Sequence, residues 1–239
     1  MFVLFDLGQT LVDLDGLVAC IGQRLRSEYP QLAPAADELS ARWIRKSSES
    51  LPRAAGRPFE REIDVAARVF SELLGVAGVP ASPRSAEGIL RRAWDEFEKE
   101  VAFCPGVSPT WLEEIKGLTA GLAIVTDGDS VNVDRLVRHL RLAKYFDVII
   151  TSESVRAYKP DPRIYVAALE ALRAEPARGL FVSDTAVDLR GASAVGMRTA
   201  FLPRRLLSEA SADLPSGSFY LERPGELGDV LRGLTSATR

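Results

Sequence analysis

Residues 2–10 read Phe2-Val3-Leu4-Phe5-Asp6-Leu7-Gly8-Gln9-Thr10, so four apolar residues lead into one carboxylate and then into a turn that contains glycine. A short apolar run that ends in turn residues is typical of a buried strand, and Asp6 then lies at the end of that strand. Asp6 is therefore a candidate nucleophile. Two further acids, Asp184 and Asp188, follow a second apolar run at residues 179–183. If the two strands are neighbours, the carboxylates meet in a magnesium site that contains a nucleophile.

The composition favours a globular protein that binds a small ligand. The 239 residues are 46% hydrophobic, which suffices for one large domain or for two unequal ones. A net charge of −3 gives no broad basic field, so neither nucleic acid nor an anionic membrane surface is expected as a partner. No apolar run has the length of a membrane span, and the N-terminal run lacks the basic flank of a signal peptide. We therefore expect a soluble, unexported protein.

The cysteines and the histidine exclude several kinds of site. Cys20 and Cys104 match no zinc or redox spacing, so they are expected to be reduced thiols in packed surroundings, which fits a cytoplasmic protein. The single histidine, His139, lies in a helical pattern and beside no candidate nucleophile. This excludes multi-histidine metal centres and argues against a Ser-His-Asp hydrolase.

The hydrophobic pattern of the chain changes near residue 17 and again near residue 101. Between these points, apolar residues recur at three- and four-residue spacing, which predicts four helices separated by breaks that contain proline or glycine. Beyond residue 101, apolar runs alternate with amphipathic segments, which predicts parallel strands joined by helices. The expected strands are residues 2–5, 121–126, 146–151, 180–183 and 199–202, and the expected helices lie near residues 107–117, 131–142, 162–173 and 187–195.

These elements predict an α/β fold: a doubly wound, Rossmann-like parallel sheet with a helical domain inserted after the first strand. Residues 1–15 and 101–239 are expected to form the core together. Residues 16–100 are expected to form the helical insert, whose four helices can bury a small core of their own.

Four polar features lie at strand ends in this scheme, where open parallel sheets bind their ligands. They are Asp6, Thr126, Lys159 with Pro160, and Asp184 with Asp188. Carboxylates offer the oxygen ligands that Mg²⁺ prefers, while the Thr126 hydroxyl and the Lys159 ammonium suit the oxygens of a transferring phosphoryl group. Lys159 is also expected to keep Asp6 ionised.

The same residues resemble the four motifs of the haloacid dehalogenase superfamily of hydrolases, in the branch with a helical cap inserted just after the first motif. The matching segments are Asp6-Leu7-Gly8-Gln9-Thr10, Ile124-Val125-Thr126-Asp127-Gly128, Lys159-Pro160-Asp161-Pro162 and Ser183-Asp184-Thr185-Ala186-Val187-Asp188. The resemblance covers nearly the whole chain and implies a magnesium-dependent phosphatase of a small phosphorylated metabolite. It implies that Asp6 attacks phosphorus, that Mg²⁺ and Lys159 shield the charge, and that water hydrolyses the aspartyl-phosphate.

Site residues follow from the resemblance as well. It implies catalytic roles for Asp6, Thr126 and Lys159, and substrate binding by Thr126, Asp127 and Lys159. The implied metal ligands are Asp6, Gly8, Asp184 and Asp188, with Gly8 contributing its backbone carbonyl.

Gly8 departs from the family pattern, because most phosphatases of the family hold a second Asp there as general acid and base. The loss of proton transfer is expected to cost about 10²- to 10⁴-fold in rate. An alkyl phosphate would suffer most, whereas an acyl or aryl phosphate already has a stable leaving group. Asp13 and Asp127 are candidate replacements for the missing acid.

Two alternatives to a phosphatase stay open. Relatives that cleave phosphonoacetaldehyde hold alanine at this position and use a lysine of the cap, for which Lys46 is the candidate. Alternatively, the chain keeps the fold but has lost efficient turnover and acts as a binding or regulatory protein. Dehalogenation is less favoured, because dehalogenases use no metal and Asp184 retains the metal-type residue.

The sequence leaves the substrate and the oligomeric state undetermined. Candidate anion contacts in the helical insert are Arg42, Arg45, Arg53 and Arg57, although most of them also fit solvated helix faces. Trp43 and Trp94 fit either a dimer contact or the insert's own core.

Overall fold

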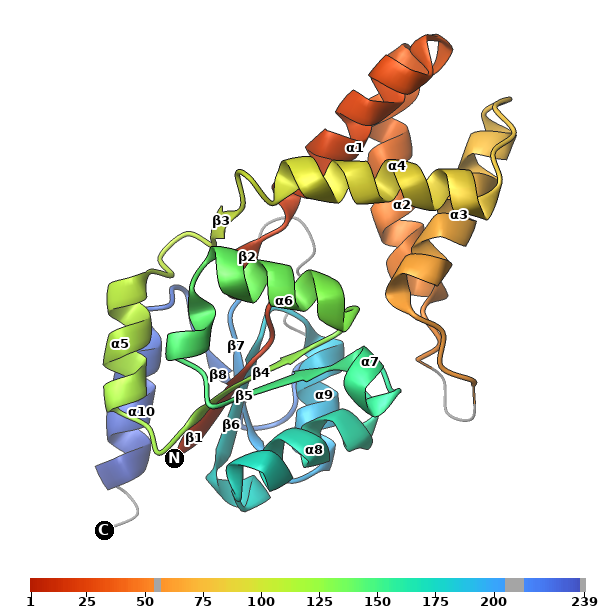
Figure 1. Cartoon of the computed structure of the whole chain (residues 1–239). Coiled ribbons are helices and arrows are strands. Elements are labelled where there is room, and N and C mark those ends of the chain that lie inside the picture. Colours follow the sequence, from red (N-terminus) through yellow and green to blue (C-terminus); the bar gives the residue numbers. More distant parts are fainter. Residues whose placement is uncertain (54–56, 205–212, 237–239) are drawn as a thin grey trace. The chain divides into compact units, whose positions relative to one another are not determined.

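The computed structural model describes residues 1–53, 57–204 and 213–236 (Figure 1). The chain divides into two compact units: a core unit of Met1–Asp13 with Ala102–Arg239, and a helical unit of Leu14–Val101. The sequence places these boundaries after residues 15 and 100, close to the observed ones. The first strand of the core unit is thus separated from its other strands by the whole helical unit.

Among the described residues, six strands form the sheet of the core unit in the order β5-β4-β1-β6-β7-β8, and all neighbouring strands are parallel. They are β1 (Phe2–Phe5), β4 (Leu122–Thr126), β5 (Val148–Thr151), β6 (Gly179–Ser183), β7 (Arg198–Phe201) and β8 (Phe219–Tyr220). After β1, the chain adds β4 and β5 on one side and the later strands on the other. The strand order therefore reverses at β1, and ligands of such sheets bind beyond the strand ends at that reversal.

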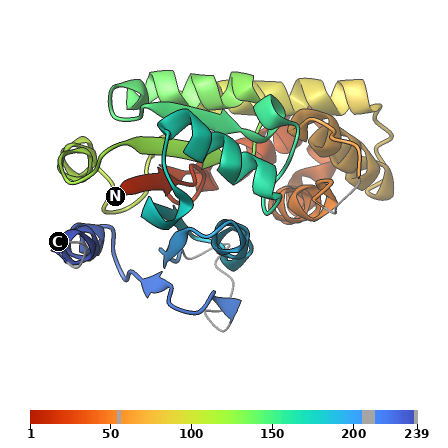
Figure 2. The same cartoon turned by 90° about the horizontal axis from the view of Figure 1, so that it is seen from below.

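Helices pack against both faces of the sheet. On one face, α8 (Pro162–Leu172) and α9 (Ala186–Ala194) bury a cluster that includes Leu4 of β1 and Phe181 of β6. The next residue, Phe5, packs its ring edge-on against Trp111 of α5 (Pro109–Gly117), with ring centroids 5.7 Å apart. Since successive side chains of a strand alternate between faces, β1 supplies both cores. Figures 1 and 2 show α5 beside α10 (Glu226–Ser236).

Most predicted elements of the core unit differ from the observed ones by one to three residues at an end, and local contacts or backbone conformation explain two of these differences. The strand predicted at residues 146–151 begins at Val148, because Phe146 packs against Phe5 and the Asp147 carboxylate accepts a hydrogen bond from the Leu122 amide at 2.9 Å. The helix predicted at residues 131–142 is α6 (Ser130–His139), because Arg141 adopts a left-handed backbone with φ of 53°.

Several elements of the core unit were not predicted. They are β8, α10, α7 (Ser152–Val155), the 3₁₀ helices η2 (Leu142–Lys144) and η3 (Pro176–Arg178), and the strands β2 (Val12–Asp13) and β3 (Ala102–Phe103). The last two form an antiparallel ribbon in which Val12 lies opposite Phe103. The chain leaves the core unit through β2 and returns to it through β3.

The helical unit contains the four predicted helices. They are α1 (Asp15–Glu28), α2 (Ala36–Ser50), α3 (Glu62–Val76) and α4 (Pro83–Phe97), with a 3₁₀ helix η1 (Pro30–Ala35) after α1. Trp43 is buried in this unit, where its indole nitrogen donates to the Ala66 carbonyl at 3.0 Å, while Trp94 is half-buried against Phe97. None of the helices in the described parts of the chain is long and apolar enough to span a bilayer.

Candidate active site

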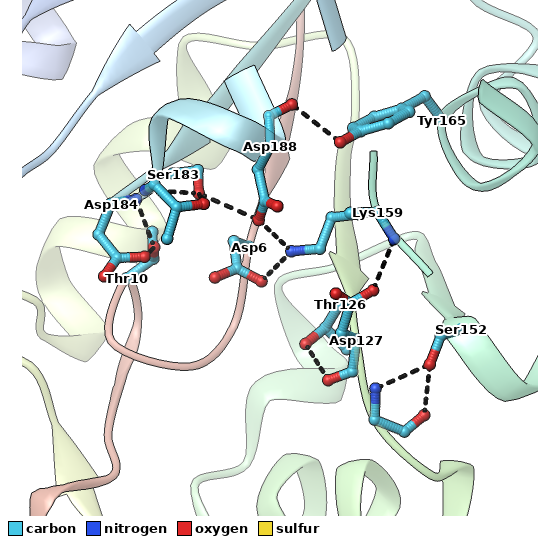
Figure 3. A network of polar contacts seen from close by, with 12 residues as sticks. Asp6, Thr10, Thr126, Asp127, Ser152, Lys159, Tyr165, Ser183, Asp184 and Asp188 are labelled. Carbon is cyan, nitrogen blue, oxygen red and sulfur yellow. Dashed lines mark hydrogen bonds and ion pairs between the residues drawn. The ribbon is translucent and has the colours of Figure 1, made fainter. Parts of the chain in front are cut away.

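The carboxyl ends of three adjacent strands bring the candidate residues together. Asp6 directly follows the central strand β1, Thr126 is the last residue of β4, and Asp184 directly follows β6. Asp188 lies in the first turn of α9. Lys159 lies between α7 and α8 rather than directly at the end of β5, because α7 intervenes. All five side chains are nevertheless buried at one end of the sheet (Figure 3).

Lys159 links two of the carboxylates. Its Nζ lies 2.6 Å from Oδ1 of Asp6 and 2.6 Å from Oδ2 of Asp188, and its side chain is only 2% exposed (Figure 3). An ammonium between two buried carboxylates satisfies the rule that buried charges are paired. Burial by itself would lower the pKa of Lys159, but the charges of Asp188, Asp6 and Asp127 outweigh it and raise that pKa. The lysine is therefore a permanent positive charge beside the candidate nucleophile.

The pKa of Asp6 is raised, whereas the sequence suggests that Lys159 keeps this carboxylate ionised. Burial raises the pKa of Asp6, the positive charge of Lys159 lowers it, and the negative charge of Asp188 raises it further. Lys159 thus does favour the ionised nucleophile, but burial outweighs its effect. A further positive charge in the site would lower the pKa of Asp6.

Asp184 is the carboxylate that Lys159 does not neutralise. Its side chain contacts Thr10, whose Oγ1 donates to Oδ1 at 3.4 Å and accepts from the Asp184 amide at 3.2 Å. The other oxygen, Oδ2, is buried and has no hydrogen-bond partner among the described residues. Burial, together with the charges of Asp6 and Asp188, raises the pKa of Asp184 to about 8. Because a buried acceptor without a partner is costly, this oxygen is suited to a cation.

Further contacts hold the ion-paired residues in place. The Lys159 amide donates to Oδ1 of Asp127 at 2.9 Å, and Tyr165 of α8 donates its hydroxyl to the Asp188 carbonyl at 2.8 Å. Gly191 of α9 permits the latter contact, because a Cβ there would lie 2.7 Å from the Tyr165 hydroxyl. Ser183 also donates to Oδ2 of Asp188 at 3.4 Å. Asp127, a predicted substrate contact and candidate acid, thus has one oxygen committed to positioning Lys159.

Thr126 and the loop after it are held by α7. The Thr126 hydroxyl is buried and donates to the Asp127 carbonyl at 3.2 Å. Beyond it, Ser152 accepts from the Gly128 amide at 2.9 Å and donates to the Gly128 carbonyl at 3.3 Å. Contacts within the protein therefore hold the loop that follows Thr126.

The sequence did not identify four of these supporting residues: Thr10, Ser152, Tyr165 and Ser183. Thr10 and Ser183 lie in the motif segments that contain Asp6 and Asp184, so their positions in the sequence could have indicated a supporting role. Ser152 and Tyr165 had no such signal, because their partners are distant backbone groups.

The donor set fits a hard divalent cation in part. Within the described residues, no group of three or more His, Cys, Asp or Glu side chains is arranged to hold a metal ion. Lys159 occupies one oxygen of Asp6 and one of Asp188, so the assignment of Asp6, Asp184 and Asp188 as metal ligands stays a prediction. The buried Oδ2 of Asp184 still provides an oxygen donor, and Mg²⁺ commonly keeps several waters. The role of the Gly8 carbonyl as a ligand stays a prediction.

The remaining candidates lie elsewhere in the chain. Asp13 belongs to the β2–β3 ribbon and is half-buried. Lys46, Arg42, Arg45 and Arg57 are exposed in the helical unit, and Arg53 is half-buried there. Their catalytic or binding roles stay predictions.

The fold and this set of residues define a family of hydrolases. The family model described as haloacid dehalogenase-like hydrolase matches residues 3–202, and the chain belongs to that family. It is therefore an enzyme of the haloacid dehalogenase superfamily, as its motifs indicated.

Its relatives include both phosphatases and dehalogenases. The chain is 26% identical to a phosphorylated carbohydrates phosphatase of Thermotoga maritima over 234 residues, which are 96% of this chain and 97% of the relative. It is 31% identical to the phosphoglycolate phosphatase of Escherichia coli K12 over 201 residues, 81% of this chain and 77% of the relative. The L-2-haloacid dehalogenase from Xanthobacter autotrophicus has the same fold, with a TM-score of 0.78, 21% identity and 98% of both chains covered.

Proposed function

We propose that this enzyme is a magnesium-dependent phosphatase of a small phosphorylated metabolite. The observation that carries the proposal is the buried Oδ2 of Asp184, which has no hydrogen-bond partner among the described residues and belongs to the same site as the ion-paired Asp6. A dehalogenase that works without metal has no use for a third buried carboxylate, whereas a magnesium site requires uncommitted oxygens. The phosphatases among its relatives support the same choice.

In this proposal, Asp6 is the nucleophile that attacks phosphorus and becomes an aspartyl-phosphate, which water then hydrolyses. Lys159 and the Thr126 hydroxyl bind the phosphoryl oxygens, and Asp127 holds the Lys159 backbone in place. The proposed magnesium ligands are Asp6, Asp184 and the Gly8 carbonyl, with Asp188 contributing through the oxygen that Lys159 does not bind. When bound, the cation would neutralise the charge that develops on the phosphoryl group.

The cellular setting is part of the same proposal. Cys20 and Cys104 are both thiols in the structure, which suits a reducing cytoplasm. The proposed partner is the phosphorylated substrate itself, with no role for nucleic acid or membrane.

The decisive experiment measures product release from a chemically varied panel, with Mg²⁺ or with EDTA. The panel contains acetyl phosphate, p-nitrophenyl phosphate, sugar phosphates, phosphonoacetaldehyde and L-2-chloropropionate. Phosphate release that requires Mg²⁺ supports the proposal. Chloride release that persists in EDTA would instead identify a dehalogenase, and cleavage of phosphonoacetaldehyde alone would favour the alternative that involves Lys46. No release from any compound would favour a binding or regulatory protein.

Gly8→Asp is expected to increase phosphatase activity on alkyl phosphates. The new carboxylic acid would protonate the leaving group, and general acid catalysis is worth about 10²- to 10⁴-fold. Gly8 does not have a positive φ, so its backbone conformation does not by itself disfavour a side chain. Gly8→Asn is the matched control, since it has the same shape and no proton to donate. The measurement is kcat/KM on a sugar phosphate and on acetyl phosphate. If Gly8→Asp and Gly8→Asn raised kcat/KM equally, or if Gly8→Asp raised it equally for both substrates, the hypothesis that Gly8 replaces a general acid would be contradicted.

Asp184→Asn is expected to abolish stabilisation by Mg²⁺ and to alter the pH dependence of stability in EDTA. Without metal, the pKa of Asp184 is about 8 in the folded chain against 3.8 in the reference state, so the folded chain holds a proton that the unfolded chain releases. The bound proton stabilises the folded chain relative to a chain whose Asp184 is ionised. This stabilisation is complete below about pH 4 and is lost as the pH rises through about 8. Asparagine has no proton to lose, so the variant should gain stability relative to the wild type between about pH 5 and about pH 9.

Thermal unfolding of both proteins over this pH range, with EDTA or Mg²⁺, measures these effects. Asp134→Asn, at an exposed position of α6, is the matched control. A wild-type melting temperature that Mg²⁺ leaves unchanged near pH 8 would contradict the metal site.

A further inference from the structure

Arg204, just beyond the last strand residues of β7, donates hydrogen bonds to three backbone carbonyls. Its Nε lies 3.2 Å from the Gln9 carbonyl oxygen, and its two terminal nitrogens lie 3.3 Å from that of Thr10 and 3.1 Å from that of Pro105. All four residues belong to the core unit. One guanidinium therefore connects the loop after Asp6 with the segment after β3.

The loop after Asp6 has a conformation that needs support. Gln9 is not glycine, yet its φ is 57°, in the left-handed region that side chains disfavour. Backbone in that region persists where surrounding contacts fix it. Within the loop, the Gln9 amide donates to the Val12 carbonyl at 2.8 Å, and the Leu11 and Val12 amides both donate to the Leu7 carbonyl at 2.9 Å. Arg204 adds charge-assisted bonds from outside the loop, which are about twice as strong as neutral ones.

The same loop orients the Asp184 carboxylate. Thr10 gives its carbonyl to Arg204 and its hydroxyl to Asp184, where it contacts both the amide and Oδ1. With Oδ1 held by Thr10, Oδ2 of Asp184 is the oxygen left without a partner. If the Thr10 backbone shifted, its hydroxyl would no longer hold Oδ1, and the orientation that leaves Oδ2 of Asp184 without a partner would be lost.

The chemistry of arginine suits this role. Its planar guanidinium presents a rigid fork of donors, whereas the lysine ammonium is a single flexible point charge. Within the described parts of the chain, every hydrogen-bond partner recorded for the Arg204 side chain is a backbone carbonyl, so the contact fixes main chain rather than a side-chain charge.

We propose that Arg204 is a positioning residue, which holds the loop after Asp6 and, through Thr10, fixes the Asp184 carboxylate for a cation. The expected effect of Arg204 on catalysis rests on the proposed function. Its effect on the conformation of residues 9–10 does not, because that effect is expected in the protein without substrate or metal. The residue touches neither Asp6 nor Asp184 itself and acts through residues 9–10.

Hydrogen exchange tests the structural part without any substrate or metal. In Arg204→Ala, the amides of Leu11, Val12 and Asp184 are expected to exchange about 10-fold faster or more, while the amides of β4 stay unchanged. Arg204→Lys should give an intermediate increase, and it carries the test if the alanine variant does not fold. Arg190→Ala is the matched control, because Arg190 also donates to a carbonyl, that of Asp213, at 3.0 Å and at an exposed site. If the Leu11 and Asp184 amides of Arg204→Ala exchanged at the wild-type rate, the proposal would be overturned.

Magnesium titration followed by thermal unfolding, and turnover of p-nitrophenyl phosphate, test the consequence. Arg204→Ala should raise the Mg²⁺ concentration for half-maximal stabilisation by about 10-fold and lower kcat to a similar extent, with KM changed less than about 3-fold. Adding Thr10→Val to Arg204→Ala should then cost little more than the larger single change, since both act through one loop. Fast exchange with unchanged Mg²⁺ response would overturn the positioning role. If the wild type hydrolyses no phosphate, the proposed function fails, and the exchange and Mg²⁺ measurements still decide this inference.

Discussion

Asp6→Asn is expected to reduce turnover by about 10⁴-fold or more, the largest functional effect of any single change in the chain. The amide cannot form the aspartyl-phosphate, and no other carboxylate follows the central strand β1 directly. The measurement is kcat/KM on the best substrate of the panel, under saturating Mg²⁺. The Asn variant should still bind substrate, because Lys159 and Thr126 are unchanged.

Loss of activity in Asp6→Asn has to be separated from loss of fold. The change removes one of the two carboxylates that pair with Lys159, so circular dichroism and a melting curve must show that the variant is folded. Asp134→Asn on the exposed face of α6 is the matched control and should keep full activity. Turnover that survives Asp6→Asn within about 10-fold would exclude Asp6 as the nucleophile.

Lys159→Met is expected to lower the free energy of unfolding by about 3–5 kcal/mol, the largest stability effect that we expect. Methionine has a similar length but no charge, so Asp6 and Asp188 would be left buried without the cation between them. Urea unfolding near neutral pH measures the loss. The loss should shrink at lower pH, because burial raises the pKa of Asp6 and its protonation removes part of the uncompensated charge.

Lys116→Met is the control for the Lys159 prediction. Lys116 is exposed on α5 and donates to the Lys144 carbonyl at 2.6 Å, so its replacement should cost no more than about 0.5 kcal/mol. If the two methionine variants were equally stable, the Lys159 ion pairs would contribute nothing to the folded state. A Lys159→Met protein that is stable at neutral pH and still active would also remove Lys159 from the mechanism.

The sequence predicted the elements that carry strong apolar patterns. The runs at residues 2–5 and 179–183 are buried neighbouring strands, and the family that the four motifs indicated is the family to which the chain belongs. The two-residue strands β2, β3 and β8 escaped prediction, because such a short strand has no periodicity to recognise. Their existence depends on pairing with distant residues, which local pattern does not record.

The sequence predicted that the candidate residues lie close together, but it did not predict which of them contact one another. Motif positions identified Asp6, Lys159 and Asp184, but the placement of Lys159 between Asp6 and Asp188 depends on the path of the chain after α7. Thr10 and Asp184 both lie in motif segments, but they are far apart in sequence, so no local pattern predicts that they contact each other. The committed oxygen of Asp127 likewise follows from the position of the Lys159 amide.

The central place of β1 in the sheet has a consequence for biosynthesis. During synthesis, Phe2–Phe5 is made before the helical unit, whereas its partner strands β4 and β6 are made only after that unit. The helical unit is one continuous segment with local contacts, so it can fold while the core is still incomplete. The apolar strand β1 therefore has no partner strand until β4 has been made, and over that interval it is an exposed apolar segment at risk of aggregation.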